Sequence, residues 1–423
     1  MARSLFTLAA AVTAAVPEAE VTGARPLTAE GAGRYDAIIA TLADGREVVI
    51  RTPSDESADR ELAAEIVALR ALTAGVRELL PVDVPEYLGS ASLGDARAVA
   101  MTMLPGYQID AAEIPPGEGA ATSIGRTLAA IHALPPSVVR SAGLPERSPE
   151  QSRADVARII DAAAASGRVP VRLTVRWRAA VDDDRLWSFE SAVGLGGTQA
   201  TSFLFGDDAR DAPVVTGVID WHGLSIDDPA VDLQWVAAAP DAARDVFATY
   251  AQTSHRAPDA ALEVRARLHA ELEFARWLVH GLESHRDDIV DDASALLESL
   301  AEGVRDNDLL AGLRRDGETD MDDAIAVLGR VPERAERVAE GSSGTAMETD
   351  AFDPSDLSLT GEVAWDDGER DQAADDEREG ADPAQPASAS PETEPLDLAD
   401  LQRSTSSSSD HTSSPRSTSS SDT

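Results

Sequence analysis

The segment 214–220 constrains the fold of this chain more than any other, because a mostly β-branched run ends there on a single acid, Asp220. Val, Ile and Thr fit a pleated sheet, so the run predicts a buried strand. After a turn, Asp228 and Pro229 predict the start of a helix. The chemistry that accompanies a carboxylate at such a position should lie just upstream. Residues 192–204, however, contain no Asp, Glu, His, Asn or Lys.

Strand patterns and helix patterns lie in separate parts of the chain. Strand-like runs with turn signals dominate the first hundred residues, and helical spacing dominates the rest. This order predicts an α+β fold with a small antiparallel sheet followed by a mainly helical region. The predicted strands span residues 21–26, 34–42, 47–52 and 98–103, with a further strand region entered at 81–87. The predicted helices span residues 57–73, 122–132, 154–165, 173–182, 241–252, 260–284, 289–304 and 321–328.

The first 16 residues fit two interpretations. One Arg, an apolar run and small residues are typical of a secretory signal peptide. We predict an Ala-rich helix instead, because the positive region is a single Arg and Pro17 with the following acids indicates a helix end. No run reaches the ~20 apolar residues of a membrane-spanning helix. The sequence therefore predicts a cytoplasmic protein with no membrane partner.

The charge and composition of the chain exclude several partners and sites. The formal net charge is −40, and such a surface repels nucleic acid and anionic lipid. The absence of Cys excludes disulfides, thiolate catalysis and Cys-based metal sites. The chain also has no Lys, since all 36 basic residues are Arg. Any mechanism that needs a catalytic or phosphate-binding Lys, including the P-loop, is therefore excluded.

Two features of the N-terminal part could serve phosphate binding or could have a purely structural role. Gly31 and Gly33 lie in the loop between two predicted strands, where a Gly-x-Gly backbone can approach a phosphate. A flexible hairpin gives the same pattern. Arg51 ends the third strand, and Glu65 lies near the middle of the next helix, so the two could form an ion pair. An exposed pair of this kind would contribute only ~0–1 kcal/mol.

Two histidine motifs of the helical region have structural explanations. We predict that His132 packs at its helix end, before a pair of prolines. The triplet 285–287 reads His-Arg-Asp and imitates the catalytic loop of protein kinases, which needs an Asn five residues after the Asp. That position is Asp292, and the triplet follows Asp220 instead of preceding it. We predict a helix junction there.

The last stretch, residues 341–423, has the composition of a disordered tail. It holds 20 of the 76 acidic residues and four of the 36 basic ones, and it ends in runs of Ser. A segment with so few apolar residues cannot offset its chain entropy by burial. Two short apolar stretches, 351–359 and 396–401, could dock on a protein partner, although a purely solvating tail is the simpler interpretation.

The order of these elements and motifs resembles the aminoglycoside and macrolide phosphotransferases over about residues 1–310. The resemblance implies a two-lobed, protein-kinase-like fold, with an N-lobe at 1–106, a helical C-lobe at 107–335 and a disordered tail at 336–423. Its most specific motifs are GVIDW at 217–221 and DPAVDL at 228–233. The other matching motifs are Asp44-Gly45 with the strand 48–51, Glu65 in its helix, LPVDVPEY at 80–87, MLPG at 103–106 and LAAIHALP at 128–135.

The resemblance also implies that the site keeps the family's metal-binding carboxylate but lacks its catalytic Asp and its metal-binding Asn. Asp220 takes the position of the family's Mg²⁺-binding carboxylate. The position of the catalytic Asp is Gly197, and that of the metal-binding Asn is Ser202. The residues implied to contact ATP or GTP are Gly31, Gly33, Arg51, Glu65 and Met103.

Three functions remain open on the sequence. The first is a pseudokinase-like member that keeps nucleotide and Mg²⁺ binding, because loss of a general base costs about 10²–10⁴ in rate. The second is an active but atypical phosphotransferase in which Glu190, Asp207 or Asp208 replaces the base, although these read more simply as loop acids. The third is a non-enzymatic module that binds a small molecule or a peptide, with the acidic tail as a partner-binding or autoinhibitory arm. An acidic cleft would suit a cationic ligand.

Overall fold

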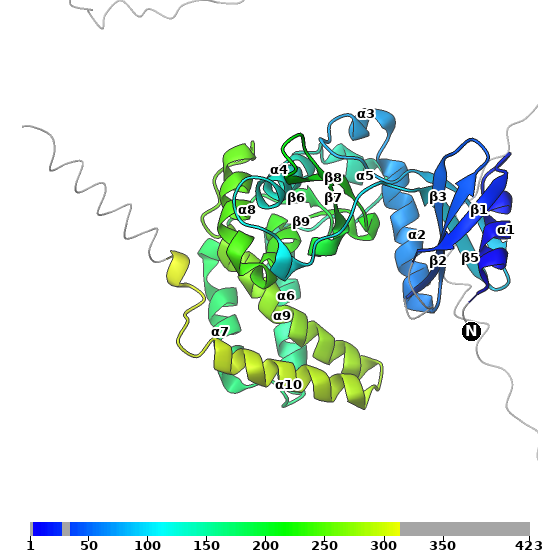
Figure 1. Ribbon diagram of the computed structural model, residues 1–423. Coiled ribbons are helices and arrows are strands. Elements are labelled where there is room, and N and C mark those ends of the chain that lie inside the picture. Colours follow the sequence, from blue (N-terminus) through cyan, green and yellow to red (C-terminus); the bar gives the residue numbers. More distant parts are fainter. Residues whose placement is uncertain (1–2, 28–33, 314–423) are drawn as a thin grey trace, which may run out of the picture. The chain divides into compact units, whose positions relative to one another are not determined.

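The computed structural model describes residues 3–27 and 34–313 (Figure 1), all of which lie in one compact unit, Met1–Glu336. The predicted helix at 321–328, the predicted acidic tail and the loop glycines Gly31 and Gly33 lie outside the described residues. The predicted division into lobes at 106 and 335 stays a prediction.

A five-stranded antiparallel sheet with the order β1-β2-β3-β5-β4 forms the N-terminal part. Helices α1 and α2 cover its two opposite faces, as Figure 1 shows. The alternation along β3 explains this arrangement, since successive side chains of a strand point to opposite faces. Val48 and Ile50 join the core under α1, and Val49 joins the core under α2. The strands are β1 (Val21–Pro26), β2 (Tyr35–Leu42), β3 (Glu47–Pro53), β4 (Tyr87–Leu93) and β5 (Ala96–Thr102), and the helices are α1 (Leu5–Ala15), α2 (Glu56–Ala71) and α3 (Ala74–Arg77).

Helix α2 begins where the sequence supplies a cap. The side chain of Asp55 accepts a hydrogen bond from the backbone N–H of Ala58 at 2.8 Å, which satisfies one free N–H of the first turn. Leu62, Ile66 and Leu69 follow at spacings of four and three residues and are buried against the sheet. This spacing places them on one face of the helix. Glu65 is thereby brought to the side of α2 that faces β3.

Two backbone connections tie the sheet to the region that follows. The N–H of Asp83 donates to Thr216 at 2.8 Å, and the Asp83 carbonyl accepts from Val218 at 3.0 Å. Tyr107 exchanges two similar bonds with Phe205, at 3.0 and 2.8 Å. The hairpin β7–β8 is therefore held on both sides by the chain segments that enter and leave β4 and β5.

The helical region contains two apolar cores. One continues from α2 through α4, α8 and the strands β7 and β8, and the other joins α6, α7, α9 and α10. The helices are α4 (Ala120–His132), α5 (Ser137–Ser141), α6 (Pro149–Ala165), α7 (Val171–Asp182), α8 (Pro240–Thr253), α9 (Leu262–Glu283) and α10 (Asp287–Gly303). The 3₁₀ segments are η2 (Ala111–Glu113), η3 (Asp184–Trp187), η4 (Ala200–Ser202), η5 (Trp221–Gly223) and η6 (Pro229–Ala238), and the short strands are β6 (Ala192–Gly194), β7 (Phe203–Asp207), β8 (Pro213–Val218) and β9 (Ser225–Asp227).

The structure differs from the predicted elements in several places, and the short helices α3 and α5 were not predicted. Strand β8 ends at Val218, two residues before Asp220, because the chain turns there into η5. The helix capped by Asp228 is a 3₁₀ segment, not an α-helix. The short strands β6 and β9, which pair with each other, were not predicted because three residues are too few to show a pattern. The predicted helix junction at 285–287 is confirmed, since α9 ends at Glu283 and α10 begins at Asp287.

Candidate functional site

Asp220 has a strained backbone conformation, and hydrogen bonds hold the residues on either side of it. Its φ is +64°, in the left-handed region that residues other than glycine seldom adopt. The N–H of Ile219 donates to the Ser202 carbonyl at 2.9 Å, and the buried indole of Trp221 donates to the Val218 carbonyl at 2.8 Å. Strain of this kind persists only where the surroundings impose it, and it concentrates at functional sites.

Ser202 lies beside Asp220, at the position implied for the metal-binding Asn. Its hydroxyl donates to Oδ2 of Asp220 at 3.1 Å, and the N–H of Gln199 points to the same hydroxyl at 3.3 Å. The segment η4 ends at Ser202, and β7 begins at the next residue. Ser202 and Asp220 therefore lie side by side, and the assignment of Ser202 to the position of the metal-binding Asn stays a prediction.

A buried carboxylate, Asp232, shapes the loop upstream of Ser202. It accepts hydrogen bonds from the N–H groups of Leu195 at 2.6 Å and Gly197 at 2.8 Å, and it lies 3.1 Å from Nε2 of His132. Nδ1 of His132 lies 2.8 Å from the hydroxyl of Tyr250. The predicted packing of His132 at the end of α4 is confirmed, since the residue is 1% exposed.

The glycines of this loop are required by its backbone. Gly196 and Gly197 have φ values of +75° and +108°. A Cβ at Gly196 would lie 2.5 Å from the carbonyl oxygen of Gly223, and a Cβ at Gly223 would lie 2.2 Å from that of Leu195. The loop and the turn after Asp220 therefore meet backbone to backbone, a distance that only glycine permits.

Position 197 has no carboxylate, and a neighbouring side chain crowds it. A Cβ at Gly197 would lie 3.3 Å from Nε2 of Gln234 and 3.6 Å from Cγ1 of Val231. Both residues belong to η6. The backbone and the neighbours therefore both limit which side chain position 197 can carry.

Arg51 and Glu65 form the ion pair that their spacing suggested. Nη2 of Arg51 donates to both carboxylate oxygens of Glu65, at 2.8 and 2.9 Å. The side chains are 14% and 4% exposed, so water screens the pair little. The guanidinium also lies 5.5 Å from the ring centroid of Tyr35, within cation–π range.

A cavity of about 390 Å³ joins this ion pair to the neighbourhood of Asp220. Arg51 and Met103 line it from the sheet side, and Ile219, next to Asp220, lines it from the other. Its remaining lining is largely apolar, which suits a flat aromatic base. The other lining residues are Leu27, Val49, Pro85, Met101, Thr102, Leu104, Gly106, Tyr107, Gln108 and Leu204.

The three acids considered as replacement bases each have partners elsewhere. Glu190 lies 3.4 Å from Arg256, and Asp207 accepts from the hydroxyl of Tyr107 at 2.6 Å. Asp208 closes the turn of the β7–β8 hairpin through the N–H groups of Arg210 and Ala212, which lower the pKa of its carboxyl. In the described part of the chain, the hydrogen bonds of these acids reach neither Asp220 nor Gly197.

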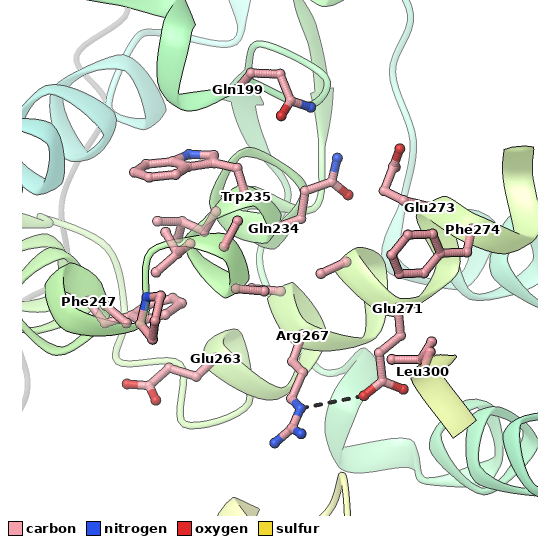
Figure 2. A pocket seen from close by; sticks show the side chains of 18 of the residues that line it. Gln199, Gln234, Trp235, Phe247, Glu263, Arg267, Glu271, Glu273, Phe274 and Leu300 are labelled. Atoms are coloured by element: carbon pink, nitrogen blue, oxygen red, sulfur yellow. Dashed lines mark ion pairs between the residues drawn. The ribbon is translucent and has the colours of Figure 1, made fainter. Parts of the chain in front are cut away.

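A larger pocket of about 900 Å³ opens next to the loop (Figure 2). Its walls come from the loop, η6, α8, α9 and the end of α10, and they are mostly apolar. Gln199 lines it from the loop, and Gln234 lines it from η6. The apolar and aromatic lining residues are Leu233, Trp235, Val236, Ala237, Ala238, Pro240, Ala243, Phe247, Ala266, Ala270, Phe274, Leu300 and Val304.

Arginines neutralise acids of this pocket. Glu271 accepts from Arg176 at 2.7 Å and lies 3.4 Å from Arg267, the ion pair drawn in Figure 2. Glu273 pairs with Arg276 at 2.6 Å. The acidic character that suggested a cationic ligand is therefore largely balanced here, and the charge of the ligand stays a prediction.

The residues at Asp220 fit a Mg²⁺ ion only in part. Mg²⁺ in nucleotide sites takes one or two carboxylates and completes its shell with phosphates and water. Asp220 supplies one carboxylate, and the hydroxyl of Ser202 is a neutral oxygen beside it. Among residues 3–27 and 34–313, no cluster of three or more His, Asp or Glu side chains could hold a metal ion.

Sequence reasoning missed Asp232 and the pocket beside it. Asp232 lies in the DPAVDL motif, but its partners Leu195, Gly197 and His132 are 35 to 100 residues away in the chain. The pocket is built from segments that carry no motif. One available signal was the pair Gln234-Trp235, because both side chains can form hydrogen bonds and they lie in an otherwise apolar run.

Comparisons with known proteins agree with the geometry. The model of the "Phosphotransferase enzyme family" matches residues 31–264, which is more than half of the chain. A solved macrolide 2′-phosphotransferase type I is 27% identical, with a TM-score of 0.55, over 69% of this chain and 96% of the other. A search of curated proteins gives no match.

Two further solved structures show the same fold at lower identity. The macrolide 2′-phosphotransferase apoenzyme from Brachybacterium faecium is 22% identical, with a TM-score of 0.57, over 66% of this chain and 94% of the other. The GDP complex of wild-type aminoglycoside 2′-phosphotransferase-IIIa is 19% identical, with a TM-score of 0.55, over 70% and 98%. In the part of the chain that the structure describes, no helix has the length and apolar character needed to cross a bilayer.

Proposed function

The chain belongs to the phosphotransferase enzyme family, and from that premise we propose that it is a catalytically impaired member that still binds a nucleotide. The observation that carries the proposal is the loop at Gly197. It keeps its anchor on Asp232 but has glycine where the family's base should stand, and Gln234 crowds that position.

The expected loss of rate follows from what phosphoryl transfer needs. Catalysis comes mainly from positioning and charge neutralisation, with a base that orients the attacking hydroxyl and a metal that neutralises the phosphates. Loss of the base costs about 10²–10⁴ in rate. Replacement of the second metal ligand by Ser202 lowers the rate further, because a neutral hydroxyl binds Mg²⁺ less strongly than an Asn carbonyl oxygen oriented toward it.

The proposed nucleotide site is the cavity between Arg51 and Ile219. Arg51, positioned by Glu65, would contact the phosphates, and Met103 would pack against the base. Asp220, with Ser202, would hold a Mg²⁺ ion carried by the nucleotide. The GDP bound in the aminoglycoside 2′-phosphotransferase-IIIa structure supports a guanine nucleotide as ligand. Gly31 and Gly33 remain proposed phosphate contacts.

A second candidate function, a non-enzymatic small-molecule receptor, is favoured by the 900 Å³ pocket. The macrolide and aminoglycoside enzymes among the similar structures make a small organic molecule the expected occupant. The proposed tail partner and the cytoplasmic location are independent of this choice.

Thermal unfolding with ATP or GTP tests nucleotide binding. With Mg²⁺ and ligand at about 100 times Kd, binding should stabilise the protein by about 2.7 kcal/mol, a rise of several degrees in Tm. Asp220→Ala should abolish the Mg²⁺-dependent part of the rise. Asp95→Ala, an exposed turn residue, is the control and should keep it. Absence of any shift with either nucleotide would refute the retained nucleotide site.

Turnover of labelled ATP and GTP against macrolides and amino alcohols tests the impairment. We expect transfer at or near background. Robust turnover would instead establish an atypical enzyme, and its loss in Glu190→Ala, Asp207→Ala or Asp208→Ala would identify the replacement base.

A further inference from the structure

Arg77, the last residue of helix α3, directs its guanidinium at main-chain carbonyls of two separate segments. Its Nε donates to the Leu72 carbonyl at 2.7 Å, and its Nη1 donates to the Val84 carbonyl at 2.6 Å. Its Nη2 donates to the carbonyls of Leu69 and Pro85, at 3.3 and 2.9 Å. One half-buried side chain therefore holds the end of one element and the approach to another.

The first of these segments is the end of helix α2. Leu69 and Leu72 belong to its last turn, whose carbonyls carry partial negative charge that a cation stabilises. The same helix carries Glu65, one turn before Leu69, and Glu65 binds Arg51 at 2.8 Å. Because a helix moves as a rigid element, an anchor at its end also fixes the carboxylate that holds Arg51.

The second segment leads to the other half of the proposed nucleotide site. Pro85 lines the 390 Å³ cavity directly. Two residues earlier, Asp83 exchanges backbone hydrogen bonds with strand β8, at 2.8 and 3.0 Å. Strand β8 ends two residues before Asp220. The segment 83–85 therefore connects Arg77 to the strand that positions the proposed metal ligand.

The shape of the guanidinium suits this double attachment. It presents five N–H donors in a fixed planar fork, whereas the ammonium of Lys is a compact point charge. Burial lowers the pKa of Arg77, and the negative charge of Glu86 opposes that effect. The four carbonyl dipoles therefore offset part of the desolvation of the cation, and the fork fixes the distance between the two segments.

We propose that Arg77 is a positioning residue that holds Arg51 and Asp220 at the separation that a nucleotide with its Mg²⁺ ion needs. It acts through the end of α2 on one side and through the segment 83–85 on the other. Arg77 itself is not among the residues that line the cavity. The inference rests on the proposed nucleotide site, and it adds a residue outside that site that controls its geometry.

Calorimetric titration of the full chain with GTP, once with Mg²⁺ and once with EDTA, tests this role. In the wild-type protein Mg²⁺ should tighten GTP binding, because Asp220 and Arg51 then engage the same phosphates. In Arg77→Gln this Mg²⁺-dependent gain should fall about tenfold, as when a metal ligand loses the group that orients it. Arg77→Lys keeps the charge without the planar fork and should lose part of the gain. It decides the question if Arg77→Gln does not fold.

Arg256→Gln is the matched control. Nη2 of Arg256 also donates to two backbone carbonyls, those of Glu190 at 2.5 Å and Ser191 at 3.0 Å, but the residue lines a different pocket. The variant should lower Tm and keep the Mg²⁺-dependent gain.

The possible results separate this inference from the proposed function. If the Arg77 variants lose Tm but keep the full gain, as the control does, Arg77 is only structural and the inference is wrong, while the nucleotide site stands. GTP binding by the wild-type protein with no gain from Mg²⁺ would overturn the inference as well. Absence of binding of both GTP and ATP by the wild-type protein would refute the proposed function, and the inference with it.

Discussion

At the scale of single residues, the backbone and the neighbours of position 197 both act against a larger side chain there. The backbone there has a φ of +108°, which strains any residue with a Cβ, and Gln234 limits the space. Both effects lower the stability of the folded protein, whether or not a reaction takes place. A larger side chain at position 197 therefore has two separate costs in folding free energy, one from backbone strain and one from side-chain packing.

Gly197→Asp should lower stability by about 1–3 kcal/mol through backbone strain and should restore no turnover. Gly167→Asp is the control, because Gly167 has a φ of +69° and nothing within 4 Å of its would-be Cβ. It should cost less. Adding Gln234→Ala to Gly197→Asp should recover part of the lost Tm by relieving the crowding. Thermal unfolding and labelled-ATP assays measure both effects, and a stable, active Gly197→Asp protein would contradict this account.

A second residue-scale prediction concerns Asp228, which is fully buried and bound by Arg265 at 2.9 Å and His269 at 3.2 Å. Burial alone would raise its pKa, but Arg265 and His269 outweigh burial and hold the pKa at about 2, below the ordinary 3.8. The folded state thus prefers the charged form. Asp228 contributes stability above about pH 4, about 2 kcal/mol, and loses it as the pH falls toward 2.

Urea unfolding from pH 5 to pH 2 measures this contribution. In Asp228→Asn, stability should be lower at pH 5 and should fall less steeply below pH 4. Asp288→Asn is the control, because the pKa of Asp288 is also about 2 but the residue lies at the surface beside Arg286. Solvent screening should leave its acid slope close to that of the wild-type protein. Identical slopes of stability against pH in all three proteins would show that Asp228 does not contribute to the loss of stability in acid.

At the scale of elements, the pair Arg51–Glu65 joins β3 to α2 across the cleft wall. Removal of one partner of a largely buried pair leaves the other charge uncompensated and costs about 3 kcal/mol. Glu65→Ala should therefore lower the free energy of unfolding by about that amount and weaken the nucleotide-induced shift in Tm. Glu61→Ala breaks the more exposed pair with Arg34 and should cost less than about 1 kcal/mol. Equal effects of the two variants would show that burial does not matter here.

At the scale of the whole molecule, residues 341–423 hold 20 acidic residues and few apolar ones, a composition that cannot bury enough apolar area to join a core. A chain that ends at residue 340 should therefore keep its Tm within about 1 °C and keep its nucleotide-induced shift. Differential scanning calorimetry of both forms checks this. A drop of several degrees would show that the acidic segment contributes to the folded unit, contrary to its composition.

The sequence predicted the elements better than it predicted the site. Apolar runs and caps located most helices and strands to within a few residues, because they reflect local backbone preferences. The proximity of Ser202 to Asp220 could also be proposed from the sequence, since both lie on one continuous stretch, and their functional roles stay predictions. Asp232 and Gln234 were not, because their roles come from partners far away in the chain. No local pattern records a positive φ at Gly197 or the space around it.

The contact between Gly196 and Gly223 has a consequence for the history of this protein. Since neither position has room for a Cβ, the loop and the turn after Asp220 can change only together. Single substitutions at either site meet a barrier before any benefit to activity arises. In evolutionary terms the contact couples the two segments, so a substitution at either glycine is tolerated only where the backbone of the other segment has already moved.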